Sequence, residues 1–106
     1  MNGRGRKRQK RQIEFLPDVA CYKPCGKRGS TLEHIVLRHD ELEALRLADF
    51  EGFYQEECAK RMGISRSTFS RILQSAHKKV ADALLHGKML MIKEENEREN
   101  RSDYDG

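Results

Sequence analysis

The sequence has no tryptophan, only two prolines and no long apolar run. Its most apolar stretch, Met89 to Ile92, falls far short of the roughly 20 residues that cross a bilayer, so we expect no membrane association. No apolar signal-peptide core follows the basic first residues, and this absence favours a cytoplasmic protein. In that compartment the three cysteines are expected to be reduced thiols rather than a disulfide framework.

Motifs of the common catalytic sites are also missing. There is no glycine-rich phosphate loop, no nucleophile elbow and no pair of histidines spaced for a metal on one helix. Three carboxylates cluster at Asp40, Glu41 and Glu43, but acids in a first helical turn are ordinary partners of the helix dipole. We therefore expect neither an enzyme nor a cofactor.

The composition limits the size of the core. The chain has 106 residues, of which 36% are charged and 37% hydrophobic. Such a chain supports one domain with a small core, which we place at residues 13–93. We expect a mainly α fold, in which a core of three helices carries a few short flanking β-strands.

Charge is strongly segregated along the chain. Residues 1–12 carry six Arg or Lys and no acid, whereas residues 94–106 carry six acids and two arginines. Neither end has a pattern that could form a core, so we expect a disordered basic arm and a disordered acidic tail. The basic arm has two interpretations: a tail that only increases solubility, or an arm that contacts DNA.

Short apolar stretches flank a helical centre. They predict strands at 13–16, 34–37 and 88–93, which could form a small sheet within one chain or between two. Capping residues, helical apolar spacing and the breaks at Gly63 and Gly87 predict helices at about 40–50, 55–62 and 65–86. A homodimer is a hypothesis that rests on the first and last of these strands being unpaired.

The predicted third helix has two different faces. Ser65 is well placed as its N-cap. Seven apolar residues share one face at helical spacing: Phe69, Ile72, Leu73, Ala76, Val80, Ala83 and Leu84. The opposite face is polar and basic, so the helix should pack by one side and present the other to solvent.

Residues Gln55 to Gln74 meet the physical demands of a helix-turn-helix. Ala59 is small where the two helices approach most closely, and Gly63 sits where the turn needs a positive φ. Apolar residues fill the positions between the helices: Cys58, Met62, Ile64, Phe69 and Ile72. The stretch Cys58 to Ala81 also holds six basic residues and no acid, which suits a polyanion.

In such a unit the second helix enters the major groove of duplex DNA and its first turns reach base edges. The residues predicted to read bases are Arg66, Ser67, Ser70 and Arg71. Those predicted to contact phosphates are Lys60, Arg61, Thr68, Gln74, Lys78 and Lys79. The predicted function is sequence-specific DNA binding in the regulation of transcription.

Longer pieces of the sequence resemble a known family. Gln55 to Val80 resembles the fourth region of sigma factors. More closely, DELEALRLADFEG, QEECAKRMGISRSTFSRIL and KVADALLHGK are similar to the uncharacterised protein family 0251, or domain of unknown function 134, of bacteria and archaea. The resemblance covers roughly Phe15 to Ile92 and implies a DNA-binding protein with a helix-turn-helix of the sigma-region-four type.

Two positions depart from this family. Tyr54 stands where a hydroxyl residue usually caps the second helix, which weakens a cap worth about 1 kcal/mol. Cys58 stands where alanine is common, and we expect it to be a small buried side chain.

Cys21 and Cys25 have a spacing seen in zinc pairs, but no second Cys or His pair accompanies them. Incidental cysteines are the favoured interpretation, and no metal site is predicted. The alternatives to a DNA-reading regulator are a metal- or redox-sensing regulator that uses Cys21 and Cys25, and a protein adaptor that contacts the transcription machinery.

Overall fold

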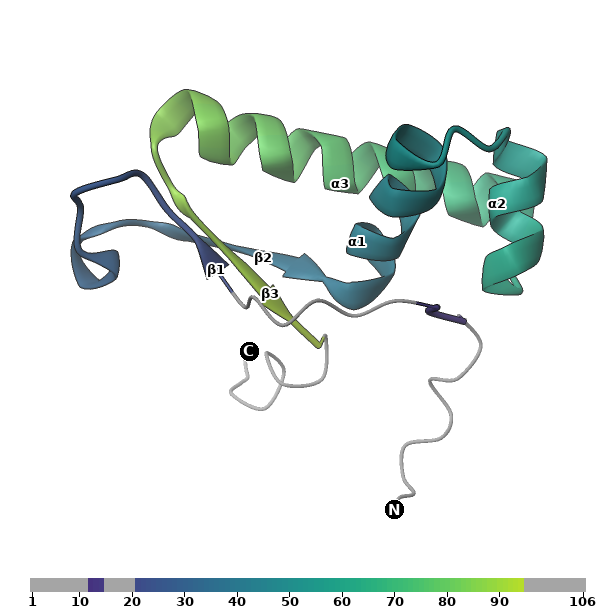
Figure 1. The fold of residues 1–106 in the computed structure, drawn as a ribbon, viewed down its shortest axis with the longest axis horizontal. Helices are drawn as coiled ribbons and strands as arrows, with labels where there is room; N and C mark the ends of the chain where they lie inside the picture. The colour runs from purple at the N-terminus through teal and green to yellow at the C-terminus, as the bar shows by residue number, and fades with distance from the viewer. Residues whose placement is uncertain (1–11, 15–20, 95–106) are drawn as a thin grey trace, which may run out of the picture.

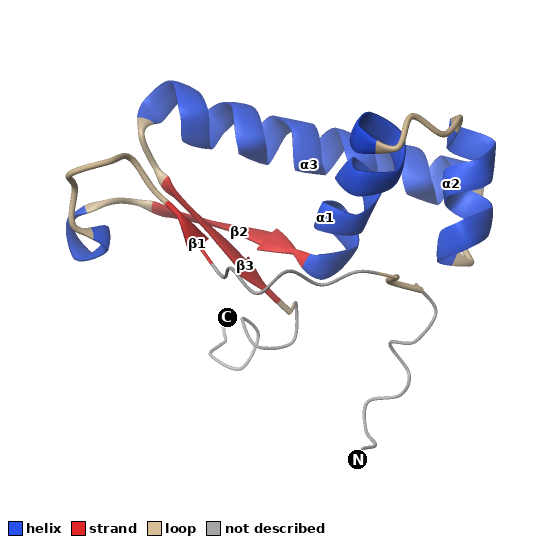
Figure 2. Ribbon diagram, viewed as in Figure 1, coloured by secondary structure: helices blue, strands red, loops and turns tan. Residues whose placement is uncertain are grey.

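A computed structural model of the chain describes residues 12–14 and 21–94. Its elements follow the order β1 (Cys21–Tyr22), β2 (His34–Arg38), α1 (His39–Leu45), α2 (Gln55–Met62), α3 (Arg66–His86) and β3 (Met89–Lys93). A 3-10 turn, Gly29–Thr31, precedes β2, and a π-helical turn, Arg46–Phe50, continues α1. The fold is mainly α with a small sheet, as the sequence predicts (Figure 2).

The three strands form one sheet in the order β1-β3-β2. β2 and β3 are parallel, with His34 opposite Met89 and Arg38 opposite Lys93, and β1 pairs antiparallel with the other edge of β3. Parallel neighbours need a long crossover connection, and here all three helices lie within it. Figure 1 shows the sheet beneath one end of α3 and α2 against the other end.

β2 and β3 agree within one residue with the strands expected at 34–37 and 88–93. The strand expected at 13–16 is wrong at Ile13 and Glu14, which are irregular, and its other two residues lie outside the described ranges. β1 occupies the edge of the sheet instead. A two-residue strand is too short to show an alternating pattern, so no feature of the sequence indicates it.

The pairing of β3 also bears on the homodimer hypothesis. β3 is the central strand and is paired on both edges within one chain. β3 therefore has no free edge with which to pair with a second chain. The other strand of the hypothesis, expected at 13–16, is not formed at Ile13 and Glu14. The oligomeric state stays a prediction.

The helices begin and end close to the expected residues, with one difference. The helix expected at about 40–50 divides into α1 and the π-helical turn, where the N–H of Glu51 donates to the carbonyl of Arg46 at 2.8 Å. This i to i+5 bond widens the last turn. Apolar residues three or four apart fit both kinds of helix, so their spacing could not reveal the change.

The core has two parts. Between the helices lies a buried cluster formed by Ala44, Leu47, Cys58, Ala59, Met62, Phe69, Ile72 and Leu73. A smaller cluster of Leu37, Ala76 and Ile92 packs the sheet against α3, and Leu45 lies against both clusters. None of the helices in the described part of the chain has the length and apolarity that a bilayer span requires.

The apolar face of α3 is narrower than expected. Leu84, which the helical spacing assigns to this face, is 79% exposed, whereas its neighbour Ala83 is buried. Beneath this end of α3 Figure 1 shows the strands and neither α1 nor α2, so fewer helix positions are covered by another helix there.

The acids at the start of α1 are not merely dipole partners, contrary to the sequence-based expectation. Glu41 is fully buried, and its carboxylate accepts hydrogen bonds from the Lys79 ammonium at 2.8 Å and the Ser75 hydroxyl at 2.6 Å. The backbone N–H of Arg38 donates to the same carboxylate at 2.8 Å. Lys79 also donates to the carbonyl of Val36 at 2.8 Å. The cluster therefore joins α1, α3 and β2.

The pKa of Glu41 is set by two opposing effects. Burial is the largest and favours the neutral acid, but the hydrogen bonds from Lys79, Ser75 and Arg38 together outweigh it. The pKa of Glu41 therefore lies below its ordinary value of 4.5.

The expected disorder of 1–12 and 94–106 falls almost entirely on residues outside the described ranges. Gln12 and Glu94 are the exceptions. Gln12 donates its backbone N–H to the carbonyl of Met62 at 2.9 Å, so it belongs to the folded domain rather than to a disordered arm. Glu94 contacts the ring of His39 through its carboxylate.

Removing the buried carboxylate should destabilise the fold. We expect Glu41→Ala to lower the free energy of unfolding by about 3 kcal/mol, because Lys79 and Ser75 lose their buried acceptor. Urea denaturation at pH 7 measures this change. The exposed Glu56 also lies in a first helical turn, and Glu56→Ala is the control, with an expected cost below about 1 kcal/mol.

The same carboxylate makes stability depend on pH. Because the pKa of Glu41 is lowered in the folded state, its stabilisation is present above about pH 4.5 and is lost as the pH falls through the folded pKa. We expect the stability of the unmodified chain to fall more steeply below pH 4.5 than that of Glu41→Gln. Thermal unfolding from pH 3 to 7 compares the two slopes, and equal slopes would exclude Glu41 as the source.

Candidate nucleic-acid interface

The start of α3 is capped as the sequence predicts. The Oγ atom of Ser65 accepts a hydrogen bond from the backbone N–H of Thr68 at 3.1 Å. The Ser65 hydroxyl also donates to Oγ1 of Thr68 at 2.9 Å. These bonds satisfy a free donor in the first turn and fix the residue at which the helix begins.

The connection between α2 and α3 is short and well ordered by hydrogen bonds. Gly63 ends α2 with a φ of 70°, in the left-handed region that favours glycine. Its N–H donates to the carbonyl of Lys60 at 3.1 Å, and the N–H of Ile64 donates to that of Ala59 at 3.0 Å. These are the bonds of a glycine-terminated helix. Tyr54 at the other end of α2 makes no side-chain cap, as expected from its position.

The outer face of α3 carries all four residues predicted to read bases. Arg66, Ser67 and Arg71 are exposed and Ser70 is half-buried. Their spacings of three and four residues put them on one side of the helix, opposite the buried Phe69. Within the described ranges, neither arginine has an ion-pair partner.

The residues predicted to contact phosphates fall into two groups. Lys60, Gln74 and Lys78 are exposed, and the described part of the chain offers them no side-chain partner. The other three already have partners within the molecule. Thr68 takes part in the cap of α3, the Lys79 ammonium contacts Glu41 and Val36, and Arg61 belongs to the ion-pair cluster described next. Phosphate contacts by these three stay predictions.

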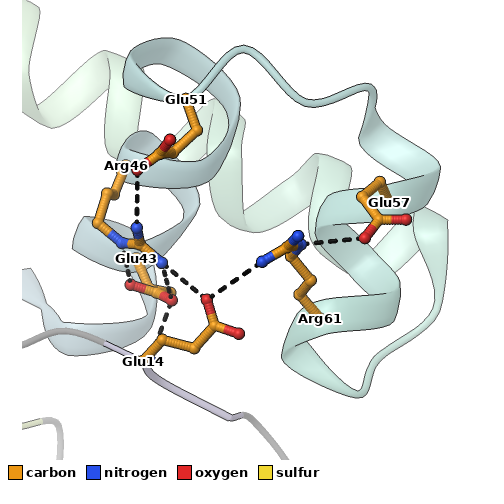
Figure 3. A network of polar contacts seen from close by, with 6 residues as sticks. All are labelled: Glu14, Glu43, Arg46, Glu51, Glu57 and Arg61. Atoms are coloured by element: carbon orange, nitrogen blue, oxygen red, sulfur yellow. Dashed lines mark hydrogen bonds and ion pairs between the residues drawn. The ribbon is translucent and has the colours of Figure 1, made fainter.

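Arg61 joins α2 to the segment 12–14 (Figure 3). Its guanidinium lies 4.2 Å from the centre of the Phe53 ring, and its Nε donates to Glu57 at 3.0 Å. The guanidinium is also 3.7 Å from the carboxylate of Glu14. Stacking and pairing together hold Arg61 against the protein.

Arg46 binds the same carboxylate from the other side (Figure 3). It donates to Glu14 at 2.8 Å, to Glu51 at 3.1 Å and to the buried Glu43 at 3.0 and 3.1 Å. The hydrogen bonds of Glu43 are the main cause that raises the pKa of Arg46 above its ordinary value. The backbone N–H of Glu14 completes the cluster with a bond to Glu43 at 3.0 Å.

No feature of the sequence indicates this cluster. Glu14 is 29 residues from Glu43 and 32 from Arg46. Spacing rules apply to residues within a few positions of each other, so they could have suggested only the local pairs of Glu43 with Arg46 and Glu57 with Arg61.

The histidines of α3 have partners that the sequence did not indicate. His77 is hydrogen-bonded to Asp49 at 2.7 Å, which ties α3 to the π-helical turn. His86 is hydrogen-bonded to Asp82 at 2.7 Å, and Lys88 contacts the same carboxylate. The bonds from His86 and then Lys88 lower the pKa of Asp82.

The cysteines lie in two environments. Cys21 and Cys25 are free and exposed, and Cys58 is fully buried between the helices, as expected. Burial is the main cause that raises the pKa of the Cys58 thiol, which suits a packing role. In the ranges 12–14 and 21–94, no three His, Cys, Asp or Glu side chains are grouped as metal ligands would be.

Comparison with known proteins adds a family and no solved structure. The profile of the family described as "Protein of unknown function DUF134" matches residues 1–100. A UPF0251 protein of Prosthecochloris aestuarii is 54% identical over 91 residues, which cover 86% of the chain and 59% of that protein. A UPF0251 protein of Moorella thermoacetica is 55% identical over 82 residues, covering 77% of the chain and 55% of that protein.

A shorter relative comes from an archaeon. UPF0251 protein PF0620 of Pyrococcus furiosus is 50% identical over 91 residues, which cover 85% of the chain and 84% of that protein. The chain thus spans less than two thirds of the two bacterial relatives. No solved structure matches it.

Loss of the α3 cap should be measurable. We expect Ser65→Ala to lower the free energy of unfolding by about 1 kcal/mol, because a backbone donor of the first turn loses its acceptor. Gln74→Ala is the control: Gln74 is exposed inside the same helix, its side chain has no partner among the described residues, and alanine is the better helix former. Urea denaturation distinguishes them, and equal effects of the two substitutions would argue against the cap.

Proposed function

This chain belongs to the DUF134 family of proteins of unknown function, and we propose that it binds duplex DNA in a sequence-specific manner as a regulator of transcription. In this proposal α2, the turn at Gly63 and α3 form a helix-turn-helix, and α3 enters the major groove. An α-helix fits that groove, where each base pair presents a distinct pattern of donors and acceptors.

One observation carries the proposal: the first turns of α3 present two exposed arginines whose guanidinium groups pair with no acid in the described part of the chain. Arg66 and Arg71 have no ion-pair partner among the described residues, although 17 of the 106 residues are Asp or Glu. Exposed arginines can bind guanine through two hydrogen bonds, and Ser67 and Ser70 can reach several base edges. We assign base reading to these four residues.

Phosphate binding is assigned to the predicted residues whose side chains have no partner in the described part of the chain. Lys60 lies in the last turn of α2, and Gln74 and Lys78 continue the outer face of α3. Lys79 and Arg61 are left out, because moving either cation to a phosphate would break bonds to carboxylates within the protein. The loss at Lys79 would be the larger, since its partner Glu41 is fully buried.

The proposal is tested by selecting the purified chain against a library of random duplexes. The selected duplex and a scrambled one of equal length are then titrated over a range of salt concentrations. Discrimination that persists at physiological salt would support sequence-specific reading. Equal, weak binding that vanishes with salt would leave only a basic surface and would overturn the proposal.

Substitutions on α3 should separate reading from phosphate binding. We expect Arg66→Ala and Arg71→Ala each to cost about 1–3 kcal/mol of binding and to relax the preference at one position of the selected site. Lys78→Ala should instead weaken both duplexes evenly and lower the salt slope by about 0.9. Fluorescence anisotropy over a salt series measures both effects.

Lys27→Ala is the matched control for these variants. Lys27 is exposed and lies between β1 and β2. In Figure 1 the connection between these two strands runs at the end of the molecule away from α2. The substitution Lys27→Ala removes the same charge as Lys78→Ala. Because this charge is far from α2, the affinity and the salt slope should stay unchanged. A loss equal to that of Lys78→Ala would mean that net charge, rather than the face of α3, determines binding.

A further inference from the structure

The structure fixes the point at which the basic segment 1–11 joins the folded domain. The backbone N–H of Gln12 donates to the carbonyl of Met62, the last residue of α2, at 2.9 Å. Gly63 follows at once, and α3 begins at Arg66. Segment 1–11 lies outside the described residues, but its attachment lies beside the turn that precedes the residues assigned to base reading.

Glu14 secures this attachment on two further elements (Figure 3). Its carboxylate is 2.8 Å from Arg46, in the π-helical turn, and 3.7 Å from Arg61 on α2. Its backbone N–H donates to the buried carboxylate of Glu43 on α1. A single exposed ion pair would hold the chain weakly. Two backbone hydrogen bonds and two ion pairs within three residues fix where it lies.

The chemistry of segment 1–11 matches the surface beside which it begins. The segment contains six Arg or Lys and no acid. Eleven extended residues reach up to about 36 Å, close to the roughly 34 Å of one turn of B-DNA. Starting beside Met62, a polycation of this length can reach phosphates or the minor groove next to the major groove that α3 is proposed to enter.

We propose that Gln12 and Glu14 fix the origin of segment 1–11 so that it binds a second stretch of DNA backbone, next to the groove that α3 enters. This inference rests on the proposed function, since both surfaces bind one duplex. Glu14 is then a positioning residue that does not touch the nucleic acid. A segment that served only solubility would not need to be fastened beside α3.

The first test compares the full chain with a chain that starts at Gln12. Both are titrated with the selected and the scrambled duplex from low to physiological salt. Deletion of segment 1–11 should weaken binding to both duplexes by about tenfold or more at low salt. The salt slope should fall by about 0.9 for each phosphate that is no longer neutralised, while the preferred site stays the same.

The second test uses the sign of a charge effect. Removing an acid near the interface should, by charge alone, strengthen binding to DNA. We expect Glu14→Ala to weaken it instead by about threefold, because the segment loses its fixed origin and its effective concentration at the duplex falls. In the chain that starts at Gln12, Glu14→Ala should no longer weaken binding.

Glu56→Ala is the matched control. Glu56 is an exposed acid on α2 with no ion-pair partner in the described ranges, and its removal should leave binding unchanged or tighter. Thermal unfolding checks that each variant is folded at the assay temperature. Glu14→Gln, which keeps the length of the side chain but not its charge, replaces Glu14→Ala if that variant is not folded.

The outcomes separate the two proposals. Tighter binding by Glu14→Ala, or an unchanged salt slope after deletion of segment 1–11, would overturn this inference and leave the proposed function standing. Failure of the full chain to bind any duplex would overturn the proposed function, and this inference with it.

Discussion

The arrangement of the whole domain depends on one buried carboxylate. Glu41 lies on α1, its partners Ser75 and Lys79 lie on α3, and the second bond of Lys79 reaches β2. A carboxylate without solvent is stable only when charges and donors surround it, so these three elements cannot separate without large cost. The small apolar core sets which faces meet, and this polar cluster sets how α3 is oriented on the sheet. The outer face of α3 is therefore presented by a rigid support.

The sequence predicted the α2–α3 unit well because local chemistry determines it. Gly63 is at the position of the turn that needs a left-handed backbone, Ser65 caps the next helix, and Cys58 and Phe69 are buried as their spacing indicates. Each of these residues acts on neighbours within a few positions. The residues assigned to base reading follow from the same periodicity, and their exposure agrees with it.

Most of the features that the sequence did not predict depend on contacts between distant residues. The apolar pattern predicts a strand at Glu14, yet its structure is determined by Arg46 and Glu43 about 30 residues away. β1 exists because β3 offers it an edge, and the π-helical turn is not visible in apolar spacing. Charge counting had a similar limit: of the six basic residues from Cys58 to Ala81, Arg61 and Lys79 neutralise acids of the protein itself. Only a structure distinguishes such internal cations from those facing solvent.

The parallel pairing of β2 with β3 has a consequence for the order of folding. The two strands flank the 50 residues from His39 to Lys88, so closing the sheet requires the ends of that long segment to meet. Contacts within and between the helices span much shorter loops and can form at a smaller loss of chain entropy. The helices would thus assemble first, and β3 would add to the sheet as the last step. The transition state for folding would then resemble the three packed helices with β2 and β3 still apart.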